Sequence, residues 1–590
     1  MLASRPPLLL ALMLAVASGC PGPKDFIECE DDTNCSRETG GRCLVNPDTD
    51  HQFCAYPDPG CSSGMRWSDL DVEDSISGEC VAGDPDAGTD TTPPTIVARS
   101  PDANATGVSR TAAVSVMFSE PIAPSSVTAS SFQVMGPGGA LAGQLAVDGP
   151  SATFTPTSPL TPSTQYTVNI GTQVTDLASN PLASSSTWMF TTGSASWSTP
   201  SLLETEMNMS ASKPRVAWGG SIVMAVWLMA PCSGAVCQLP TQLWYSVRQG
   251  GVWSPGAAIA GVTGTLHEPS LTVDAMGRAA VVYPATVSNR ISIYATIYSG
   301  GTWSAPSTIE TDDTGNATQV ASAVDAGGNV YAVWQQNDGQ RDNIIGNRYV
   351  PGVGWGTAAP LEQSATAAAT PSVAAGADGA AFAAWTQGTM MYGARFSTGA
   401  WGQPSVAGSG SGRIRVAMHT DGSAIVVWPN GNDVLANRNT GAWGTAAPID
   451  GLDGTAFQAF ALAMPEGRAM ALWTQSGDLW QCRYDPAQGW GAAFRIETAG
   501  GTAQYPTLAF APDGSGLGAW EQPSPATTVS PWANLFLPTS GWGAAQLAKP
   551  DDGVSVREPT SFYDPQGNAF GAVWLASPSG YPSVYAASLQ

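Results

Sequence analysis

Residues 300–310 read GGTWSAPSTIE, and residues 194–204 read SASWSTPSLLE, a closely similar stretch much earlier in the chain. The shared pattern, a Trp followed by small residues and often Pro, recurs through the second part of the sequence at intervals of 42 to 56 residues. Its eight tryptophans are Trp197, Trp253, Trp303, Trp355, Trp401, Trp443, Trp490 and Trp542. A recurrence at this interval is typical of a repeat architecture.

A second element lies between these tryptophans, a turn with Gly followed six or seven residues later by an aromatic residue. It also occurs eight times, as Gly220 with Trp227, Gly277 with Tyr283, Gly328 with Trp334, Gly379 with Trp385, Gly422 with Trp428, Gly467 with Trp473, Gly514 with Trp520 and Gly567 with Trp574. The stretches beside it have the period of β-strands. A unit of about 50 residues with four short strands has the size of one propeller blade. The sequence therefore predicts an all-β chain with an eight-bladed β-propeller, or a seven-bladed one if a unit is degenerate.

The two ends of the repeat region complete each other. Trp197 has no inner strands before it, and Trp574 has no outer strand after it. We therefore expect residues 194–204 to supply the outer strand of the last blade, so that residues 194–590 form a closed ring. Closure of this kind leaves no exposed sheet edge.

The recurring aromatic and arginine residues have a structural interpretation. Tryptophans that return in every unit are expected to pack between sheets rather than to stack on a ligand. A further position in the third strand carries Trp244, Trp480 or Trp532 in some units and Tyr in others. Four arginines also recur in that strand and are interpreted as structural: Arg348, Arg395, Arg438 and Arg483.

A smaller β domain precedes the repeats. After a solvated linker at residues 81–93, six short segments are predicted to be strands: TIVARS, AAVSVMF, SFQVM, ATFTP, QYTVNI and STWMFTT. Together they are typical of a β-sandwich. The stretches at Pro93-Pro94, 118–121, 166–170, 175–182 and 190–193 resemble the bacterial Ig-like domains of surface-layer and other envelope proteins. The resemblance implies an Ig-like spacer or adhesive module over residues 94–193.

The cysteines point to an oxidising compartment. Six of them crowd into residues 20–80 with little apolar sequence between them, so disulfides are expected to hold this small module together. They are Cys29, Cys35, Cys43, Cys54, Cys61 and Cys80, and the sequence does not choose among their 15 possible pairings. The lack of CxxC pairs argues against zinc. Cys232 and Cys237 are expected to close a small loop, and Cys482 is the odd thiol, with a structural role.

The N-terminus reads as a secretory leader. Residues 1–19 combine Arg5, an apolar run and small residues, and they are too short to span a membrane. The stretch 17–20, Ala-Ser-Gly-Cys, resembles a bacterial lipobox, which implies that Cys20 carries lipid and anchors the protein to a membrane. Pro21 favours the outer membrane or cell surface by the same resemblance. The alternative is an ordinary cleaved leader followed by a chance Cys.

Composition narrows the function. The net charge of −24 and the small number of basic residues exclude a nucleic-acid footprint. No nucleotide or metalloprotease motif occurs, and the three histidines are scattered, so no cofactor and no metal centre is predicted. Two acidic clusters, residues 30–32 and Asp312-Asp313 with Asn316, offer the oxygen ligands that calcium prefers, although neither has EF-hand spacing.

We expect a ligand at the mouth of the central channel. Two sets of residues are predicted to reach it, those that open the first strand of a unit and the polar residues after the second-strand Trp. The first set is Lys213, Glu268, Thr370, Tyr505 and Glu558, each followed by Pro, with His267 and Arg413 beside equivalent positions. The second set is Gln335, Gln387, Gln475 and Gln522. The units resemble sialidase-like propellers in general, but their Asp-Gly turns lack the Ser and Trp of the sialidase Asp box.

These observations predict a lipid-anchored envelope protein whose propeller face binds a glycan or a protein. An alternative is a glycoside hydrolase or lyase, in which Glu268 and Glu558 act as acid and base. A second alternative is a structural surface spacer. Whether the protein is an enzyme stays open from the sequence, with binding the favoured function.

Overall fold

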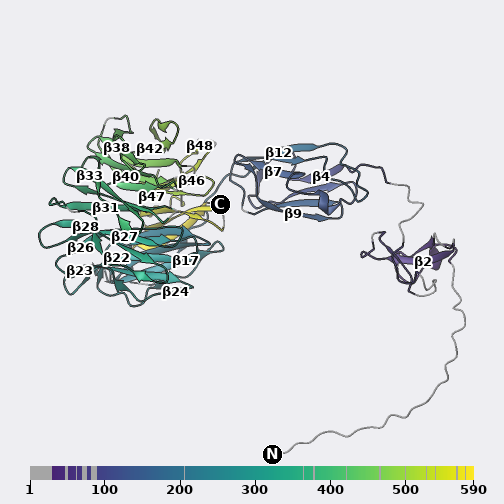
Figure 1. The fold of residues 1–590 in the computed structure, drawn as a ribbon, viewed down its shortest axis with the longest axis horizontal. Helices are drawn as coiled ribbons and strands as arrows, with labels where there is room; N and C mark the ends of the chain where they lie inside the picture. The colour runs from purple at the N-terminus through teal and green to yellow at the C-terminus, as the bar shows by residue number, and fades with distance from the viewer. Residues whose placement is uncertain are drawn as a thin grey trace, which may run out of the picture.

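The computed structural model describes residues 29–589 apart from residues 47–48, 50, 62, 70–75, 82–89, 158, 205, 207, 235, 363, 377–378, 420, 453, 464–466, 499, 526–527, 539, 567–568 and 579. The leader at residues 1–19, Cys20 and most of the linker therefore lie outside the described residues. Three folded parts follow one another along the chain (Figure 1). Their described elements are β-strands and two 3₁₀ turns, η1 (Asp32–Asn34) and η2 (Pro124–Ser126), which confirms the all-β fold class.

The first part is a three-stranded sheet held by disulfides. Its strands pair in the order β1 (Arg42–Val45), β2 (Gln52–Pro57) and β3 (Met65–Trp67). The cysteines pair as Cys29–Cys43, Cys35–Cys54 and Cys61–Cys80. Among the described residues of this part, the buried hydrophobic cluster consists of Phe53, Ala55, Trp67 and Val81. A core of this size cannot by itself offset the conformational entropy that the chain loses on folding. The three disulfides therefore supply much of the stability of this part.

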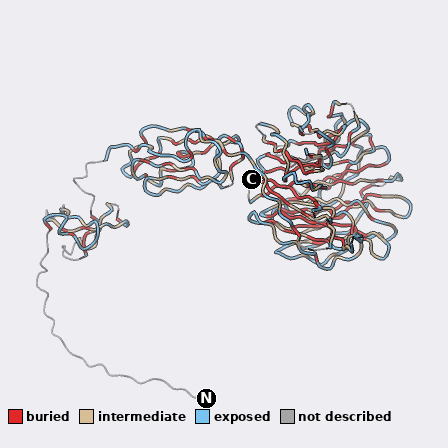
Figure 2. The backbone as a smooth tube through the Cα atoms, turned by 180° about the vertical axis from the view of Figure 1, so that it is seen from behind, coloured by how far each residue is buried: buried red, intermediate tan, exposed pale blue. Residues whose placement is uncertain are grey.

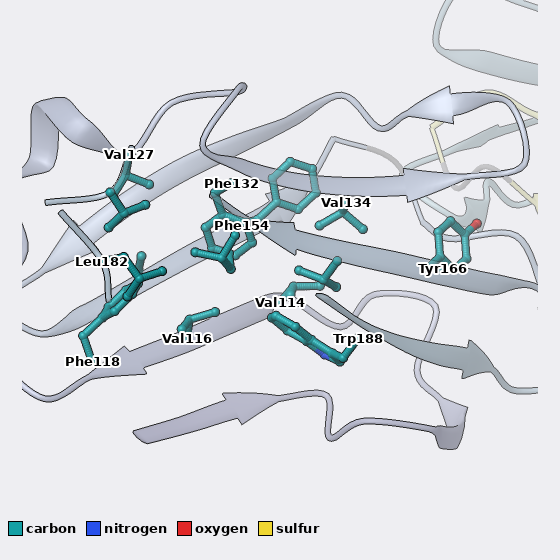
Figure 3. Close-up of a cluster of buried hydrophobic side chains, with 14 of the residues drawn as sticks. Val114, Val116, Phe118, Val127, Phe132, Val134, Phe154, Tyr166, Leu182 and Trp188 are labelled. Atoms are coloured by element: carbon teal, nitrogen blue, oxygen red, sulfur yellow. The ribbon is translucent and has the colours of Figure 1, made fainter. Parts of the chain in front are cut away.

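The second part is a two-sheet sandwich, as the Ig-like pattern predicted. One sheet runs β4 (Ile96–Ser100), β6 (Val114–Phe118), β10 (Ser151–Pro156), β9 (Gly143–Asp148). The other runs β5 (Ala105–Val108), β12 (Ser186–Thr192), β11 (Gln165–Ile170), β7 (Phe132–Gly136), β8 (Gly139–Ala140). Alternate residues such as Val114, Val116 and Phe118 point inward and meet Phe132, Phe154 and Trp188 from both sheets (Figure 3). The strict alternation of the strands therefore produces one apolar layer between the sheets.

The third part consists of eight sheets among the described residues, which we number as blades 1 to 8. Blade 1 holds β14 (Met209–Gly219), β15 (Ile222–Ser233), β16 (Val236–Cys237), β17 (Gln242–Gln249), β18 (Val252–Trp253) and β19 (Ala257–Ala258). Blade 2 holds β20 (Thr265–Leu266), β21 (Ser270–Val273), β22 (Ala279–Val287), β23 (Arg290–Ser299), β24 (Thr302–Trp303) and β25 (Ser307–Thr308). Blade 3 holds β26 (Ala317–Val324), β27 (Val330–Asn337), β28 (Asp342–Val350), β29 (Gly354–Trp355) and β30 (Ala359–Pro360).

The remaining blades repeat the same order. Blade 4 holds β31 (Ala368–Ala375), β32 (Ala381–Gln387), β33 (Met390–Ser397), β34 (Ala400–Trp401) and β35 (Ser405–Ser409); blade 5 holds β36 (Arg415–Met418), β37 (Ala424–Asn430), β38 (Asp433–Asn439) and β39 (Ala447–Pro448). Blade 6 holds β40 (Ala456–Ala463), β41 (Ala469–Gln475), β42 (Asp478–Asp485), β43 (Gly489–Trp490) and β44 (Phe494–Arg495). Blade 7 holds β45 (Gln504–Phe510), β46 (Gly516–Pro523), β47 (Val529–Leu537), β48 (Gly541–Trp542) and β49 (Gln546–Leu547); blade 8 holds β50 (Val556–Asp564), β51 (Ala569–Ala576), β52 (Ser583–Leu589) and β13 (Ser201–Leu202).

The innermost strands close a ring. Each of β14, β21, β26, β31, β36, β40, β45 and β50 contacts the next, and β50 contacts β14 again. Blade 8 takes its outer strand from the start of the region, because β13 pairs with β52 and Trp197 bridges Leu589. Buried residues lie in the interior of this part, and exposed residues lie at its periphery (Figure 2).

Buried aromatic residues hold the blades together. The second-strand tryptophans are all fully buried: Trp227, Trp334, Trp385, Trp428, Trp473, Trp520 and Trp574. The recurring arginines of the third strand lie over aromatic rings, as Arg348 does over Phe396 at 5.2 Å and Arg483 over Phe536 at 5.3 Å. Packing between sheets and cation–π contact account for both recurring residue types.

Candidate functional site

A ring of β-bulges surrounds the axis of the propeller. In six innermost strands, two residues lie opposite one residue of the second strand, and that one residue is the buried repeat Trp. The first residue of each bulge has a left-handed backbone, with φ between 49° and 53°: Lys213, Gln319, Thr370, Gln458, Tyr505 and Glu558. Left-handed backbone is strained for residues other than Gly, and such strain clusters at functional sites. Bulges also redirect side chains.

Blades 2 and 5 have equivalent positions without the left-handed bulge. Glu268 lies in the break between β20 and β21, and Arg413 lies two residues before β36. We name the eight residues together the bulge ring: Lys213, Glu268, Gln319, Thr370, Arg413, Gln458, Tyr505 and Glu558. Gln319, Arg413 and Gln458 are exposed, and Tyr505 is 49% exposed. The ring thus presents cations, carboxylates, amides and one aromatic group to solvent.

Two of these residues, Gln319 and Gln458, were not predicted, because the prediction relied on a following Pro. A different signal identifies them. Seven of the eight ring residues lie nine positions before the turn glycine of their unit, as Gln319 lies before Gly328 and Gln458 before Gly467. Only Lys213 departs from this spacing, at seven positions before Gly220.

Hydrogen bonds between a backbone N–H of one blade and a side-chain oxygen of the preceding blade connect three pairs of neighbouring blades. The backbone N–H of Thr370 donates to Gln319 Oε1 at 3.2 Å, and that of Tyr505 donates to Gln458 Oε1 at 2.7 Å. The N–H of Glu558 donates to Glu521 Oε1. These contacts satisfy backbone groups that the bulges release from the sheet. They also hold the ring residues in fixed positions.

Charged residues gather on one part of the ring. Lys213 Nζ lies 3.3 Å from Glu558 Oε1 and 3.8 Å from Glu268 Oε2. Arg215 Nη2 pairs with Glu268 Oε1. Arg413 also acts electrostatically on Glu268. Because these pairs are partly exposed to water, they contribute little to stability and leave the groups available to a ligand.

Arg415 of blade 5 joins this group. Burial, together with the like charges of Arg413 and Arg215, lowers the pKa of Arg415 to about 10, and Glu268 opposes the shift. We name Lys213, Arg215, Arg413, Arg415, Glu268 and Glu558 the charge cluster. It contains four of the 23 Lys and Arg residues of a chain whose net charge is −24. Four cations against two carboxylates leave the cluster locally positive.

The two carboxylates proposed as acid and base are thus joined through Lys213. Burial acts to raise the pKa of Glu268, but the charges of Arg215 and Lys213 outweigh it and lower this pKa below its usual value. A general acid needs a raised pKa in order to hold its proton at neutral pH. The positive charges of Arg215 and Lys213 therefore do not favour Glu268 as an acid.

Three predicted ligand residues are buried, so their assignment to the ligand face is wrong. Gln387, Gln475 and Gln522 are at most 4% exposed. Each accepts a hydrogen bond from the indole N–H two residues earlier, and Gln475 also donates to Asp450 Oδ2 at 2.9 Å. These amides bridge the buried Trp to the loop that enters the blade, which is a structural role.

The other two predicted residues lie in local contacts. Gln335 Nε2 donates to Asp342 Oδ2 at 2.9 Å in the neighbouring strand. His267 Nε2 lies 2.9 Å from Thr286 Oγ1, and burial lowers the pKa of its imidazole. Both side chains are half-buried. Among the described residues, neither side chain forms a hydrogen bond with a side chain of the charge cluster.

The acidic clusters considered for calcium are engaged in turns. Asp31 caps η1, Asp312 accepts from the N–H of Thr314, and Asp313 pairs with Arg290. Among the described residues, a different carboxylate set converges: Asp90, Glu120 and Asp176 in the Ig-like domain, with ligand oxygens within 4.8 Å of one another. Burial and the neighbouring Asp90 and Asp176 raise the pKa of Glu120. Oxygen donors of this kind suit a hard cation.

Comparisons with known proteins show the following. Residues 90–192 match the family model of the bacterial Ig-like domain. No curated protein matches the chain. Similar solved structures include a Dyadobacter fermentans protein of unknown function, 12% identical over 67% of this chain and 99% of that one, with a TM-score of 0.37. A six-bladed fucose-recognising lectin of Aleuria aurantia is 14% identical over 49% and 98%, with a TM-score of 0.31. An ulvan lyase is 11% identical over 53% and 91%, with a TM-score of 0.38. Likenesses of this size transfer no ligand to this chain.

Proposed function

We propose that this protein is an exported binding module of the bacterial cell envelope, which uses the bulge ring to hold an acidic glycan. The charge cluster is the observation that supports the proposal. A chain with a net charge of −24 repels anions over most of its surface, yet four cations gather around Glu268 and Glu558. A locally positive site in such a chain focuses anions at one place.

The rest of the ring suits the hydroxyl groups and ring faces of a sugar. Gln319, Thr370 and Gln458 offer polar groups, and Tyr505 offers an exposed aromatic ring. Guanidinium groups bind carboxylate or sulfate by charge-assisted hydrogen bonds. An acidic polysaccharide would use both kinds of group, whereas an acidic protein segment would use mainly the cations.

Export and attachment complete the proposal. Four disulfides among the described residues and the Ig-like domain fit an extracellular or surface protein. The predicted leader and the lipid on Cys20 would attach the chain to the outer membrane or cell surface. No helix of the described residues is long and apolar enough to cross a bilayer.

The test is binding of the purified chain to alginate, chondroitin sulfate and neutral dextran on a sensor surface. Binding to the acidic polymers, weakened by salt, supports the proposal. Arg413→Gln and Arg415→Gln are each expected to weaken it by about 10-fold or more, the size of one charge-assisted hydrogen bond. Arg99→Gln in the Ig-like domain removes the same charge and serves as the control. Equal binding to dextran, or no loss in the ring variants, would refute the proposal.

The same samples separate the alternatives. Release of reducing ends or unsaturated products from a polymer, abolished by Glu268→Gln, would favour the hydrolase or lyase. Absence of binding to any polymer, together with capture by an acidic peptide, would favour a protein ligand. Absence of every interaction would favour a structural spacer.

A further inference from the structure

The Ig-like domain lies against one side of the propeller, beside the C-terminus of the chain (Figure 1). A cavity at the junction has a volume of about 20 Å³, little more than one water molecule needs, so the two surfaces lie close together. The Ig-like domain lines this cavity with Arg110, Thr161 and Pro162. Blades 7 and 8 line it with Asp513, Ser515, Leu535, Leu537, Phe570 and Leu589.

The propeller residues at the junction lie on the face opposite the bulge ring. The ring residue Tyr505 lies at the start of β45, and Asp513 and Ser515 lie in the turn after the end of that strand. Because neighbouring strands of a blade are antiparallel, the starts of second strands and the ends of third strands lie at the same face as this turn. The other lining residues occupy those positions: Leu535 and Leu537 in β47, Phe570 in β51 and Leu589 in β52. We name this face the rear face.

The connection between the two domains is short and is fixed at both ends. The N–H of Gly193 donates to the carbonyl oxygen of Val108 at 2.9 Å within the Ig-like domain. Trp197 bridges Leu589 of blade 8, and Ala195 packs against the apolar cluster of blades 7 and 8. Residues 194–196 are therefore the whole length of chain between the two attachments, and three residues allow the domains little separation.

Blade 7 differs from the other units in the residues that it presents at the junction. Two third-strand positions near the rear face carry Leu535 and Leu537, and both side chains are half-buried. In the other units at least one of the two positions is polar or charged. Their pairs are Val247 and Gln249, Ile297 and Ser299, Arg348 and Val350, Arg395 and Ser397, Arg438 and Thr440, Arg483 and Asp485, and Ser588 and Gln590. Burial of apolar surface against the Ig-like domain explains why blade 7 has two leucines here.

We propose that the rear face of blades 7 and 8 is a docking surface for the Ig-like domain of the same chain, which holds the propeller in one orientation with the bulge ring facing away from that domain. The apolar contact of Leu535 and Leu537 and the three-residue connection act together. The Ig-like domain is then a rigid support rather than a flexible spacer, and a large ligand reaches the bulge ring without meeting it. This proposal concerns orientation and does not rest on what the ring binds.

The experiment is single-molecule fluorescence energy transfer on a chain that begins after Cys20. One dye is attached at Met189→Cys in the Ig-like domain and the other at Val353→Cys or Gln340→Cys in blade 3, while the buried Cys482 stays unlabelled. Val353 and Gln340 are exposed, the first in a turn at the rear face and the second in a loop at the ring face. Each pair is expected to give one narrow distribution of transfer efficiency, with the higher efficiency for Val353. A broad distribution, or the reverse order, would overturn the proposal.

A double variant tests the docking contact itself. Leu535→Arg with Leu537→Ser gives blade 7 the residues of blade 4, and it is expected to broaden both distributions because it replaces apolar contact surface by a charge and a hydroxyl. Ile297→Arg makes the first of these changes in blade 2, at a residue that does not line the junction cavity, and is expected to leave both distributions narrow. Circular dichroism checks that both variants are folded.

The outcomes separate this proposal from that for the bulge ring. Narrow distributions in the folded double variant would overturn the docking surface. Binding of the double variant to alginate in solution is expected to equal that of the wild type, because the bulge ring lies at the other end of the innermost strands. Failure of every chain to bind alginate would refute the bulge-ring proposal alone, since the energy-transfer measurement needs no ligand.

Discussion

The Cys482 thiol lies 3.1 Å from the carbonyl oxygen of Gly491, the residue that follows the outer-strand Trp490. Asn437 and Asn534 make the same contact in blades 5 and 7, to Gly444 and Gly543. Ser246, Thr296 and Asn347 do so in blades 1 to 3. The odd cysteine therefore replaces a recurring polar residue that ties the third strand to the outer strand.

The first prediction concerns the reactivity of this thiol. Burial raises the pKa of Cys482 to about 11, and the residue is 0% exposed. Only the thiolate reacts readily, so a native chain that begins after Cys20 is expected to give no thiol signal with Ellman's reagent at pH 8 and one thiol per chain in urea. Rapid labelling of the native protein would contradict the structural role.

The second prediction concerns pH. Burial raises the pKa of Glu204, Glu310 and Glu497 above the ordinary value of 4.5. Between that value and the raised pKa the folded state binds more protons than the unfolded state, so the stability from these groups falls as pH rises. The Tm of the propeller is expected to be higher at pH 5 than at pH 8, as calorimetry would show.

Glu497→Gln tests the source of this pH effect. The substitution removes a carboxyl that is easier to bury when protonated, so the dependence of Tm on pH should become weaker. Asp433→Asn, at an exposed position where β38 begins, is the matched control and should leave the dependence unchanged. An unchanged dependence in Glu497→Gln would assign the effect to other groups.

The third prediction separates the buried glutamines from the half-buried one. Gln475 Oε1 accepts from Trp473, and its Nε2 donates to Asn432 O at 2.8 Å and to Asp450 Oδ2 at 2.9 Å. Gln475→Ala leaves these buried groups unpaired and is expected to lower the free energy of unfolding by about 2–4 kcal/mol. Gln335→Ala is expected to change it by less than about 1 kcal/mol. Urea titration of both variants measures the difference, and equal losses would contradict it.

The fourth prediction concerns ring closure. A chain that begins at residue 194 keeps β13, whereas one that begins at residue 206 exposes the edge of β52. Unpaired edges invite association between chains. The shorter chain is therefore expected to unfold at lower temperature and to aggregate in light scattering, while the longer one stays monodisperse. Equal behaviour would mean that the N-terminal strand does not contribute to the fold.

The order of strands in each blade was readable from the sequence because it depends on neighbouring residues. The Gly turn, the buried Trp and the outer-strand Trp lie within one unit, and the alternation of side chains along a strand follows from backbone geometry. The disulfide module was also predictable, whereas its pairing required the structure, since six cysteines allow 15 arrangements.

The glutamines show where sequence reasoning failed. Gln335 is one residue after its Trp, whereas Gln387, Gln475 and Gln522 are two residues after theirs. Successive side chains of a strand point to opposite faces. The prediction therefore treated Gln335 and the three other glutamines as equivalent although they lie on opposite faces of their strands. The nine-residue spacing to the turn glycine, which every ring residue except Lys213 keeps, would have separated these ring residues from the buried amides.

Local sequence was enough to establish the strands, the repeat and the small modules, because each is formed by residues close together in the chain. Which charged residues meet in the charge cluster could not be predicted from local sequence, because it depends on closure of the ring. Lys213, Glu268, Arg415 and Glu558 belong to four blades, and their encounter follows from the curvature of the whole propeller.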